Sequence, residues 1–318
     1  MRALVTGASG FIGSHVVAAL TAAGAEVRGF DKVAGEAECE LVLGDICDHD
    51  ALARAIDGCE AVFHLAAVYS YRRADAALMH AVNVEGTRVL LEAARSRGAR
   101  RIVHTSSCAT CGPVAGRPAT EADAPSAWEL RVPYKRSKLA AEALALRAAA
   151  AGLPVVVVNP TTPVGSGDRA PTPTGRMVAD VAHGKARGYL AHSALNVVAV
   201  EDVARGHLLA CERGHAGERY LLGGENLTLR EVFAAIARAA GRPEPRLPVP
   251  WTLAYAAGRV SDAAQRLAGR EPGLLNLDEI RVARWPMLFD DSRARRELGY
   301  SSQPAAAALT AAVRALAP

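Results

Sequence analysis

A tyrosine and a lysine stand four residues apart at the start of an alanine-rich stretch, in Pro133-Tyr134-Lys135-Arg136-Ser137-Lys138. Proline suits the first turn of a helix, so we expect a helix over 134–151, with Tyr134 and Lys138 on one face. Free tyrosine has a pKa of about 10 and is a poor acid–base group, but a nearby ammonium group stabilises the phenolate and lowers that pKa. Tyr134 is therefore a candidate proton donor or acceptor for a carbonyl or alcohol oxygen, with Lys138 tuning it.

A serine follows a second apolar run, in Val103-His104-Thr105-Ser106-Ser107. If Ile102-Val103 is a central strand, Ser107 lies at its carboxyl end, where open α/β sheets bind ligands. Ser107 would then hydrogen-bond the reacting oxygen beside Tyr134. The alternative is a serine that caps a turn.

Three glycines follow the first apolar run, in Val5-Thr6-Gly7-Ala8-Ser9-Gly10-Phe11-Ile12-Gly13. Gly7 suits a tight turn, Gly10 lets the backbone approach a pyrophosphate, and Gly13 lets the following helix pack closely on the sheet. The helix N-terminus would face the phosphates. A strand–turn–helix at this place predicts a dinucleotide site rather than a plain turn, and the charge of a bound nicotinamide ring would lower the Tyr134 pKa further.

An acidic residue ends the second expected strand, at Asp31. A carboxylate there accepts hydrogen bonds from both ribose hydroxyls and repels a 2′-phosphate, which favours NAD over NADP. The adjacent Lys32 could offset part of that repulsion, and a turn residue is the alternative for Asp31. Asp45 and Ile46 follow the third expected strand, where they either line an adenine pocket or form a turn.

Short β-branched runs alternate with helical patterns through the first half of the chain. This alternation predicts an α/β fold, a Rossmann-type doubly wound parallel sheet with helices on both faces. The expected strands are 3–5, 25–27, 41–43, 61–63, 102–103 and 155–158, and the expected helices are 11–23, 49–57, 75–96 and 134–151.

Prolines and glycines cluster after Pro160, and helical patterns follow at 176–186, 229–240 and 251–268. We expect strands at 196–200 and 220–222 to return to the main sheet. The resulting division is a dinucleotide-binding domain over 1–160 with returning segments at about 193–222, and a smaller, mostly helical substrate-binding cap made of 161–192 and 223–318.

Seven motifs in order resemble the extended form of the short-chain dehydrogenase/reductase superfamily, over nearly the whole chain. They are Thr6 to Gly13, Asp45-Ile46, His64-Leu65-Ala66-Ala67, Asn83-Val84-Glu85-Gly86-Thr87, Thr105-Ser106-Ser107, Tyr134 to Lys138 and Val200-Glu201-Asp202-Val203-Ala204.

The resemblance implies a catalytic set of Ser107, Tyr134 and Lys138, a bracing role for Asn83, and a homodimer through helices like those at 75–96 and 134–151. The cofactor-binding residues that it implies, together with those argued above, are Gly7, Gly10, Phe11, Ile12, Gly13, Asp31, Asp45, Ile46, Leu65, Ala66, Ala67, Tyr134, Lys138 and Pro160.

Three later stretches look most like the hopanoid-associated sugar epimerase group, which is itself similar to dihydroflavonol reductases. They are Asn159 to Gly165, Pro171 to Arg176 and Leu222 to Thr228. Nucleotide-sugar enzymes of the superfamily use an asparagine and an arginine to contact diphosphate where this chain has Thr162 and Leu195. Losing the guanidinium removes much of that recognition, so a non-nucleotide carbonyl or alcohol becomes the leading substrate class.

Four residues are candidates for contact with this substrate, namely Cys108, Thr161, Thr162 and Tyr69. For Tyr69, a surface loop is an equal alternative. Cys108 and Cys111 form a C-x-x-C without a second pair or a histidine cluster, so we expect no metal site.

Composition narrows the class of protein further. There are 37 basic and 33 acidic residues without a basic stripe, so nucleic-acid binding is not indicated. No apolar run is long enough to span a bilayer, and six scattered cysteines together with the early first strand favour a reducing cytoplasmic setting. We therefore expect an NAD(P)-dependent oxidoreductase, with a sugar epimerase that retains NAD, or a non-catalytic dinucleotide sensor, as the alternatives.

Overall fold

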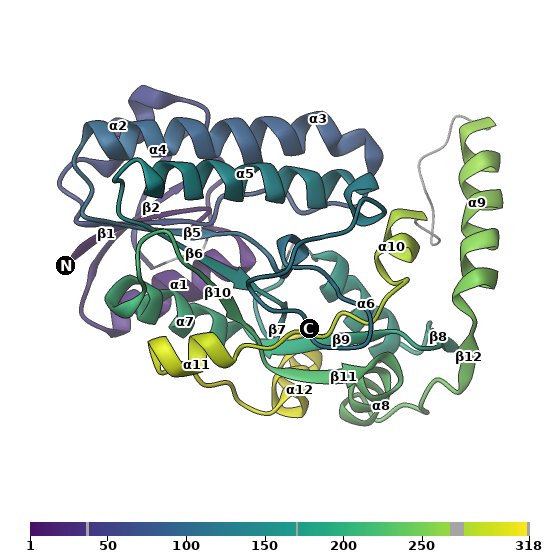
Figure 1. The fold of residues 1–318 in the computed structure, drawn as a ribbon. Coiled ribbons are helices and arrows are strands. Elements are labelled where there is room, and N and C mark those ends of the chain that lie inside the picture. The colour runs from purple at the N-terminus through teal and green to yellow at the C-terminus, as the bar shows by residue number, and fades with distance from the viewer. Residues whose placement is uncertain (36–37, 170, 268–276, 317–318) are drawn as a thin grey trace.

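The computed structural model describes residues 1–35, 38–169, 171–267 and 277–316. Its centre is a seven-stranded sheet in the order β10-β6-β5-β4-β1-β2-β3, in which every neighbouring pair is parallel (Figure 1). This order confirms the Rossmann-type sheet. Its strands are β1 (Arg2–Thr6), β2 (Glu26–Asp31), β3 (Glu40–Leu43), β4 (Ala61–His64), β5 (Arg101–Thr105), β6 (Val155–Pro160) and β10 (Arg219–Leu222).

Helices cover both faces of this sheet (Figure 1). One face carries α1 (Phe11–Ala22), α7 (Val200–Arg213) and α11 (Ser292–Leu298); the other carries α2 (His49–Ile56), α3 (Ala76–Met79), α4 (Gly86–Ser96) and α5 (Pro133–Ala150). The expected helix at 75–96 is α3 and α4 joined by a π-helical segment, His80–Glu85.

The all-valine part of β6 shows why the fold has two layers of helices. Val156 and Val158 pack in the core cluster with α1 and α7, whereas Val155 and Val157 pack in the cluster with α2 and α4. Successive side chains of a strand point to opposite faces, so a run without polar residues fits a strand that is buried on both sides.

The C-terminal region is mostly helical, as expected, and holds two small sheets. A three-stranded sheet has the order β11-β9-β7, and β12 pairs with β8. The elements are β7 (Thr162–Val164), α6 (Pro173–Ala182), β8 (Gly188–Leu190), β9 (Ala194–Ala199), β11 (Glu225–Thr228), α8 (Leu229–Ala239), β12 (Leu247–Val249), α9 (Trp251–Leu267), α10 (Leu277–Val282) and α12 (Ala305–Arg314).

One sequence-based expectation about these strands is wrong. The strand expected at 196–200 does not return to the main sheet, because β9 pairs in parallel with β7 and antiparallel with β11. Only β10 joins the main sheet, next to β6. The chain leaves β9 directly into α7, a helix that the sequence analysis did not anticipate.

Candidate active site

A cavity of about 430 Å³ opens at the carboxyl edge of the main sheet and extends toward the C-terminal region. It brings together most of the residues singled out from the sequence. Those that line it are Gly7, Gly10, Phe11, Ile12, Gly13, Leu65, Ala67, Tyr69, Ser107, Cys108, Tyr134, Lys138, Pro160, Thr161 and Thr162. The remaining four, Asp31, Asp45, Ile46 and Ala66, lie outside its lining.

The glycine turn forms the end of the cavity nearest β1. Gly7 has a φ of +70°, and a Cβ there would lie 2.7 Å from the Ala66 backbone nitrogen. A Cβ on Gly13 would overlap the Gly7 carbonyl oxygen. No side chain caps α1 at Gly10, so amide groups of its first turn remain available to an anion at the positive end of the helix dipole.

Asp31 lies at the end of β2, beside this turn. Its carboxylate accepts hydrogen bonds from the Ser9 amide at 3.0 Å, the Lys32 amide at 2.7 Å and the Val33 amide at 3.3 Å. The Lys32 ammonium is 3.3 Å from Asp45 instead. A hydrogen bond from the Cys47 amide, aided by Lys32, lowers the pKa of Asp45.

Ile46 and Ala66 have packing contacts. A Cβ on Gly86 of α4 would lie 2.7 Å from Ile46 Cγ2. The Ala66 amide donates to Thr6 Oγ1 at 3.3 Å, and its backbone contacts the Gly7 turn. Their expected contact with a cofactor stays a prediction.

Tyr134 is buried at the second position of α5. Its ring centre lies 4.6 Å from that of Tyr69 and 6.1 Å from that of Tyr71. Burial and the neighbouring Tyr69 phenol raise the pKa of Tyr134 well above its ordinary value, and a hydrogen bond with the Ser107 hydroxyl opposes them. The pKa of Tyr134 is thus raised, whereas the sequence analysis expected Lys138 and a bound nicotinamide ring to lower it. That expectation included the charge of a bound nicotinamide ring, and in that form it stays a prediction.

Ser107 and Lys138 line the same cavity as Tyr134 and come from two different elements. The Ser107 hydroxyl accepts from the Ala109 amide at 3.2 Å, so the serine caps a short 3-10 turn and also lines the cavity. Lys138 Nζ donates to the Thr105 carbonyl oxygen at 2.7 Å. Burial lowers the pKa of Lys138 to about 8, and the Glu142 carboxylate opposes that shift.

Asn83 ties the loop after β4 to the helix that carries Tyr134. Its side chain accepts from the Val68 amide at 2.7 Å and donates to Ser137 Oγ at 2.9 Å. Ser137 Oγ in turn donates to the Tyr134 carbonyl oxygen at 2.8 Å. Asn83 therefore connects the loop after β4 to α5.

The end of the cavity away from the glycine turn is walled mainly by apolar side chains, most of which the sequence analysis missed. They are Pro163, Pro173, Met177, Leu190, Leu195, Leu229, Val282, Ala283 and Met287, and the aromatic side chains of Tyr69 and Tyr71 line the cavity as well. They come from separate segments, so no local motif marks them. Glu279 also lines the cavity; burial raises its pKa, and Arg176 lies 3.8 Å away.

The two cysteines of the C-x-x-C are buried beside the cavity. Burial raises the pKa of both the Cys108 and the Cys111 thiol to about 12. Cys108 lines the cavity and Cys111 does not. Among the residues that the structure describes, no group of three His, Cys, Asp or Glu side chains could hold a metal ion, and no helix there is long and apolar enough to cross a membrane.

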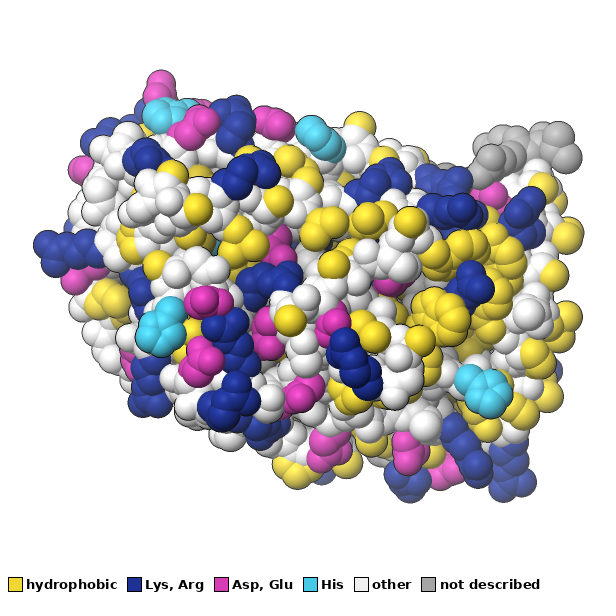
Figure 2. Space-filling model, viewed as in Figure 1, with side chains coloured by type: hydrophobic (Ala, Val, Ile, Leu, Met, Phe, Trp, Pro, Cys, Tyr) yellow, Lys and Arg dark blue, Asp and Glu magenta, His cyan; other side chains and the backbone are white. Residues whose placement is uncertain are grey.

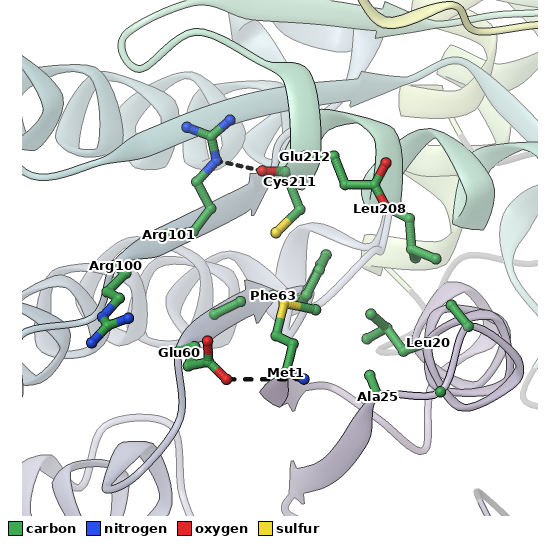
Figure 3. A pocket seen from close by; sticks show the side chains of 13 residues that line it. Met1, Leu20, Ala25, Glu60, Phe63, Arg100, Arg101, Leu208, Cys211 and Glu212 are labelled. Atoms are coloured by element: carbon green, nitrogen blue, oxygen red, sulfur yellow. Dashed lines mark hydrogen bonds and ion pairs between the residues drawn. The ribbon is translucent and has the colours of Figure 1, made fainter.

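A second cavity, of about 550 Å³, lies at the opposite, amino edge of the sheet (Figure 3). Its walls include Leu20, Phe63 and Leu208. Arg101 Nε donates to the Cys211 carbonyl oxygen at 2.7 Å, and Glu60 lies 3.9 Å from the amino group of Met1. None of the residues predicted to do chemistry lines this cavity.

Comparisons with known proteins agree with this geometry. The model of a family described as the NAD dependent epimerase/dehydratase family matches residues 3–223. A provisionally named dihydroflavonol 4-reductase of Synechocystis sp. is 36% identical over 97% of this chain and 92% of that protein. Sterol demethylase protein B of Methylococcus capsulatus is 35% identical over 98% of this chain and 97% of that protein. The dTDP-glucose 4,6-dehydratase DesIV of Streptomyces venezuelae, solved as a double mutant with NAD and DAU bound, is 26% identical with a TM-score of 0.79, over 99% of this chain and 96% of that one.

Proposed function

Because the chain belongs to the NAD dependent epimerase/dehydratase family, we propose that it is an oxidoreductase that moves a hydride between NAD and a secondary alcohol or carbonyl of a non-nucleotide small molecule. The observation that carries the proposal is the single cavity in which the glycine turn, Ser107, Tyr134 and Lys138 meet an apolar wall. A dinucleotide site next to an acid–base group is the arrangement that hydride transfer requires.

The residues at the glycine turn fit NAD. The first turn of α1 would receive the pyrophosphate, and Asp31 would accept hydrogen bonds from the ribose hydroxyls. The Lys32 ammonium pairs with Asp45, so it is not paired with the Asp31 carboxylate and does not neutralise the charge that repels a 2′-phosphate. This arrangement supports NAD over NADP.

Bound NAD supplies the hydride acceptor, or as NADH the donor. The Tyr134 phenol takes the proton from an alcohol or gives it to a carbonyl oxygen, while the Ser107 hydroxyl holds that oxygen in place. With a pKa of about 8, Lys138 is mostly protonated at neutral pH, and its charge one helical turn from Tyr134 favours the phenolate.

The substrate class follows from the cavity wall. Thr162 and Leu195, which stand where nucleotide-sugar enzymes bind diphosphate, both line it. Lys135 also lines it, but its ammonium is paired with Glu129. Neither Thr162 nor Leu195 offers a cationic side chain to neutralise the charge of a diphosphate. An apolar ketone or alcohol, by contrast, would gain free energy by burying its apolar surface against this wall. The relatives named as a dihydroflavonol 4-reductase and a sterol demethylase protein support an apolar carbonyl compound.

A sugar epimerase that retains NAD is the second candidate, and the likeness to an NAD-bound dTDP-glucose dehydratase favours it. The reaction would use the same acid–base group, with hydride returned to the opposite face of the oxidised sugar.

Cofactor release and turnover distinguish the two candidates. Acid denaturation of purified protein should release no stoichiometric nicotinamide, and NADH should be consumed with apolar cyclic ketones. Stoichiometric NAD in the released fraction, with interconversion of nucleotide sugars, would establish the epimerase instead. No consumption of either cofactor across alcohols, polyols and carbonyls would refute the oxidoreductase.

A further inference from the structure

Helix α9 stands at the edge of the molecule and is packed on one side only (Figure 1). Its inner face lies against α10: Trp251 Nε1 donates to the Ile280 carbonyl oxygen at 2.7 Å, and a Cβ on Gly258 would lie 2.7 Å from Ile280 Cδ1. This packing fixes which face of α9 points outward.

The outward face of α9 carries apolar residues at helical spacing. The exposed apolar residues on it are Leu253, Ala256, Ala257, Val260, Ala263 and Ala264, and Thr252 and Arg259 are exposed at its border. Leu253 is 63% exposed and Val260 is 70% exposed. Outward helix faces are normally polar, so a contiguous apolar stripe indicates contact with an apolar phase or surface.

All three tryptophans of the chain gather beside the base of this helix. The Arg284 guanidinium lies 4.7 Å from the ring centre of Trp128, 5.3 Å from that of Trp251 and 5.1 Å from that of Trp285. Trp285 is 39% exposed. Tryptophan and arginine together are typical of protein surfaces at a membrane–water interface.

The surroundings of the stripe are basic. Arg259 is exposed on α9 itself, and Arg242 and Arg246 are exposed in the segment that leads into β12 and α9. Of the acidic residues there, Glu244 pairs with Arg238 at 3.0 Å and Asp262 of α9 is half-buried. The part of Figure 2 where α9 lies shows hydrophobic side chains bordered by Lys and Arg. This charge suits an anionic surface.

We propose that α9 lies on the surface of an anionic lipid bilayer, with Leu253 and Val260 inserted among the headgroups. A second copy of the chain fits less well, because a stable interface uses about 20–30 residues a side and this stripe has six, four of them alanine. Helix α9 also neighbours elements that form the active-site cavity: its inner face packs on α10, which contributes Val282 to the cavity wall, and β12, which leads into α9, pairs with β8, which contributes Leu190. Docking places the cavity close to the phase into which apolar carbonyl compounds partition, whether or not the proposed reaction is correct.

Vesicle flotation tests the docking directly. The full-length protein should float with vesicles of equal parts phosphatidylcholine and phosphatidylglycerol, and less with phosphatidylcholine alone. Since all tryptophans lie beside α9, their emission should shift to the blue and be quenched by brominated lipid. Absence of flotation by the unaltered protein overturns the proposal.

A double variant, Leu253→Glu with Val260→Glu, should weaken vesicle binding at least about tenfold, because two side chains no longer insert. Both positions are exposed, so NAD binding and the circular dichroism spectrum should not change. The matched control is Ala307→Glu with Leu316→Glu, which adds the same charge at exposed apolar positions elsewhere and should float normally. Unchanged flotation of the α9 variant overturns the proposal, and so does a fall in its molar mass by light scattering, which would identify the stripe as an interface between copies.

Discussion

The cavities at the two edges of the main sheet differ in volume and in the side chains that line them, and the one with the larger volume has none of the predicted catalytic or cofactor-binding residues in its wall. The cavity at the amino edge has a volume of about 550 Å³ and the one at the carboxyl edge about 430 Å³. At the amino edge two polar side chains have protein partners: Arg101 binds backbone carbonyls, and the Glu60 carboxylate lies 3.9 Å from the Met1 amino group (Figure 3). The Glu60 carboxylate also accepts from the Arg2 amide at 3.1 Å. At the carboxyl edge, Tyr134 and Lys138 face a space large enough for a ligand.

The difference follows from the direction of the strands. In a parallel sheet the loop that follows each strand begins at the carboxyl edge. Side chains from loops far apart in the sequence therefore lie close together at that edge. Helices end and strands begin at the other edge, where polar side chains are needed to satisfy the last carbonyls of helices. We therefore expect substitutions at the carboxyl edge to change catalysis and those at the amino edge to change stability.

The largest effect is expected for Tyr134→Phe, which removes the proton-transferring oxygen and keeps the ring in its contact with Tyr69. Turnover should fall by about 10²–10⁴-fold, while NAD binding measured by calorimetry stays the same. Tyr220→Phe is the matched control, because Tyr220 is also buried and its hydroxyl donates to Glu297 at 3.0 Å, away from the cavity. If the Tyr134 variant kept its full turnover, Tyr134 would not be the residue that transfers the proton.

The parts of this site that the sequence predicted are the ones encoded locally. The Gly7 turn and the Tyr134–Lys138 spacing each lie within a few residues, so backbone geometry alone brings them to one place. The apolar wall is different: Leu195 and Met287 are neighbours through an isolated bridge between segments far apart in the chain, and each reads alone as an ordinary core residue. The prediction that β9 joins the main sheet was wrong for the same reason. A short apolar strand could pair in the main sheet or in the small β11-β9-β7 sheet, and its own residues do not show which.

A smaller effect is expected for Asp31→Asn. One negative charge near a 2′-phosphate costs about 1 kcal/mol in water at 4 Å, so its removal should raise the ratio of kcat/KM with NADP to that with NAD by about fivefold. Asp57→Asn is the control, since Asp57 is exposed, pairs only loosely with Arg97 at 3.4 Å and lies outside both cavities. A ratio that does not change would place the ribose away from the end of β2.

The smallest catalytic effect, and a clear effect on stability, is expected for Arg101→Met. The Arg101 guanidinium donates to the Cys211 carbonyl oxygen at 2.7 Å, to that of Ala210 at 3.2 Å and to that of Gly214, so it satisfies the carboxyl end of α7. Methionine keeps much of the side-chain volume but removes the donor to the Cys211 and Gly214 carbonyls, while the Ala210 carbonyl keeps its bond from the Gly214 amide. This loss should lower the free energy of unfolding by about 1–3 kcal/mol in urea titrations, with kcat/KM unchanged. The neighbouring Arg100 lines the same cavity without capping the helix, so Arg100→Met should stay within about 0.5 kcal/mol. If Arg101→Met instead lowered kcat/KM at constant stability, the amino-edge cavity would be functionally coupled to the site, and the division of roles between the two edges would fail.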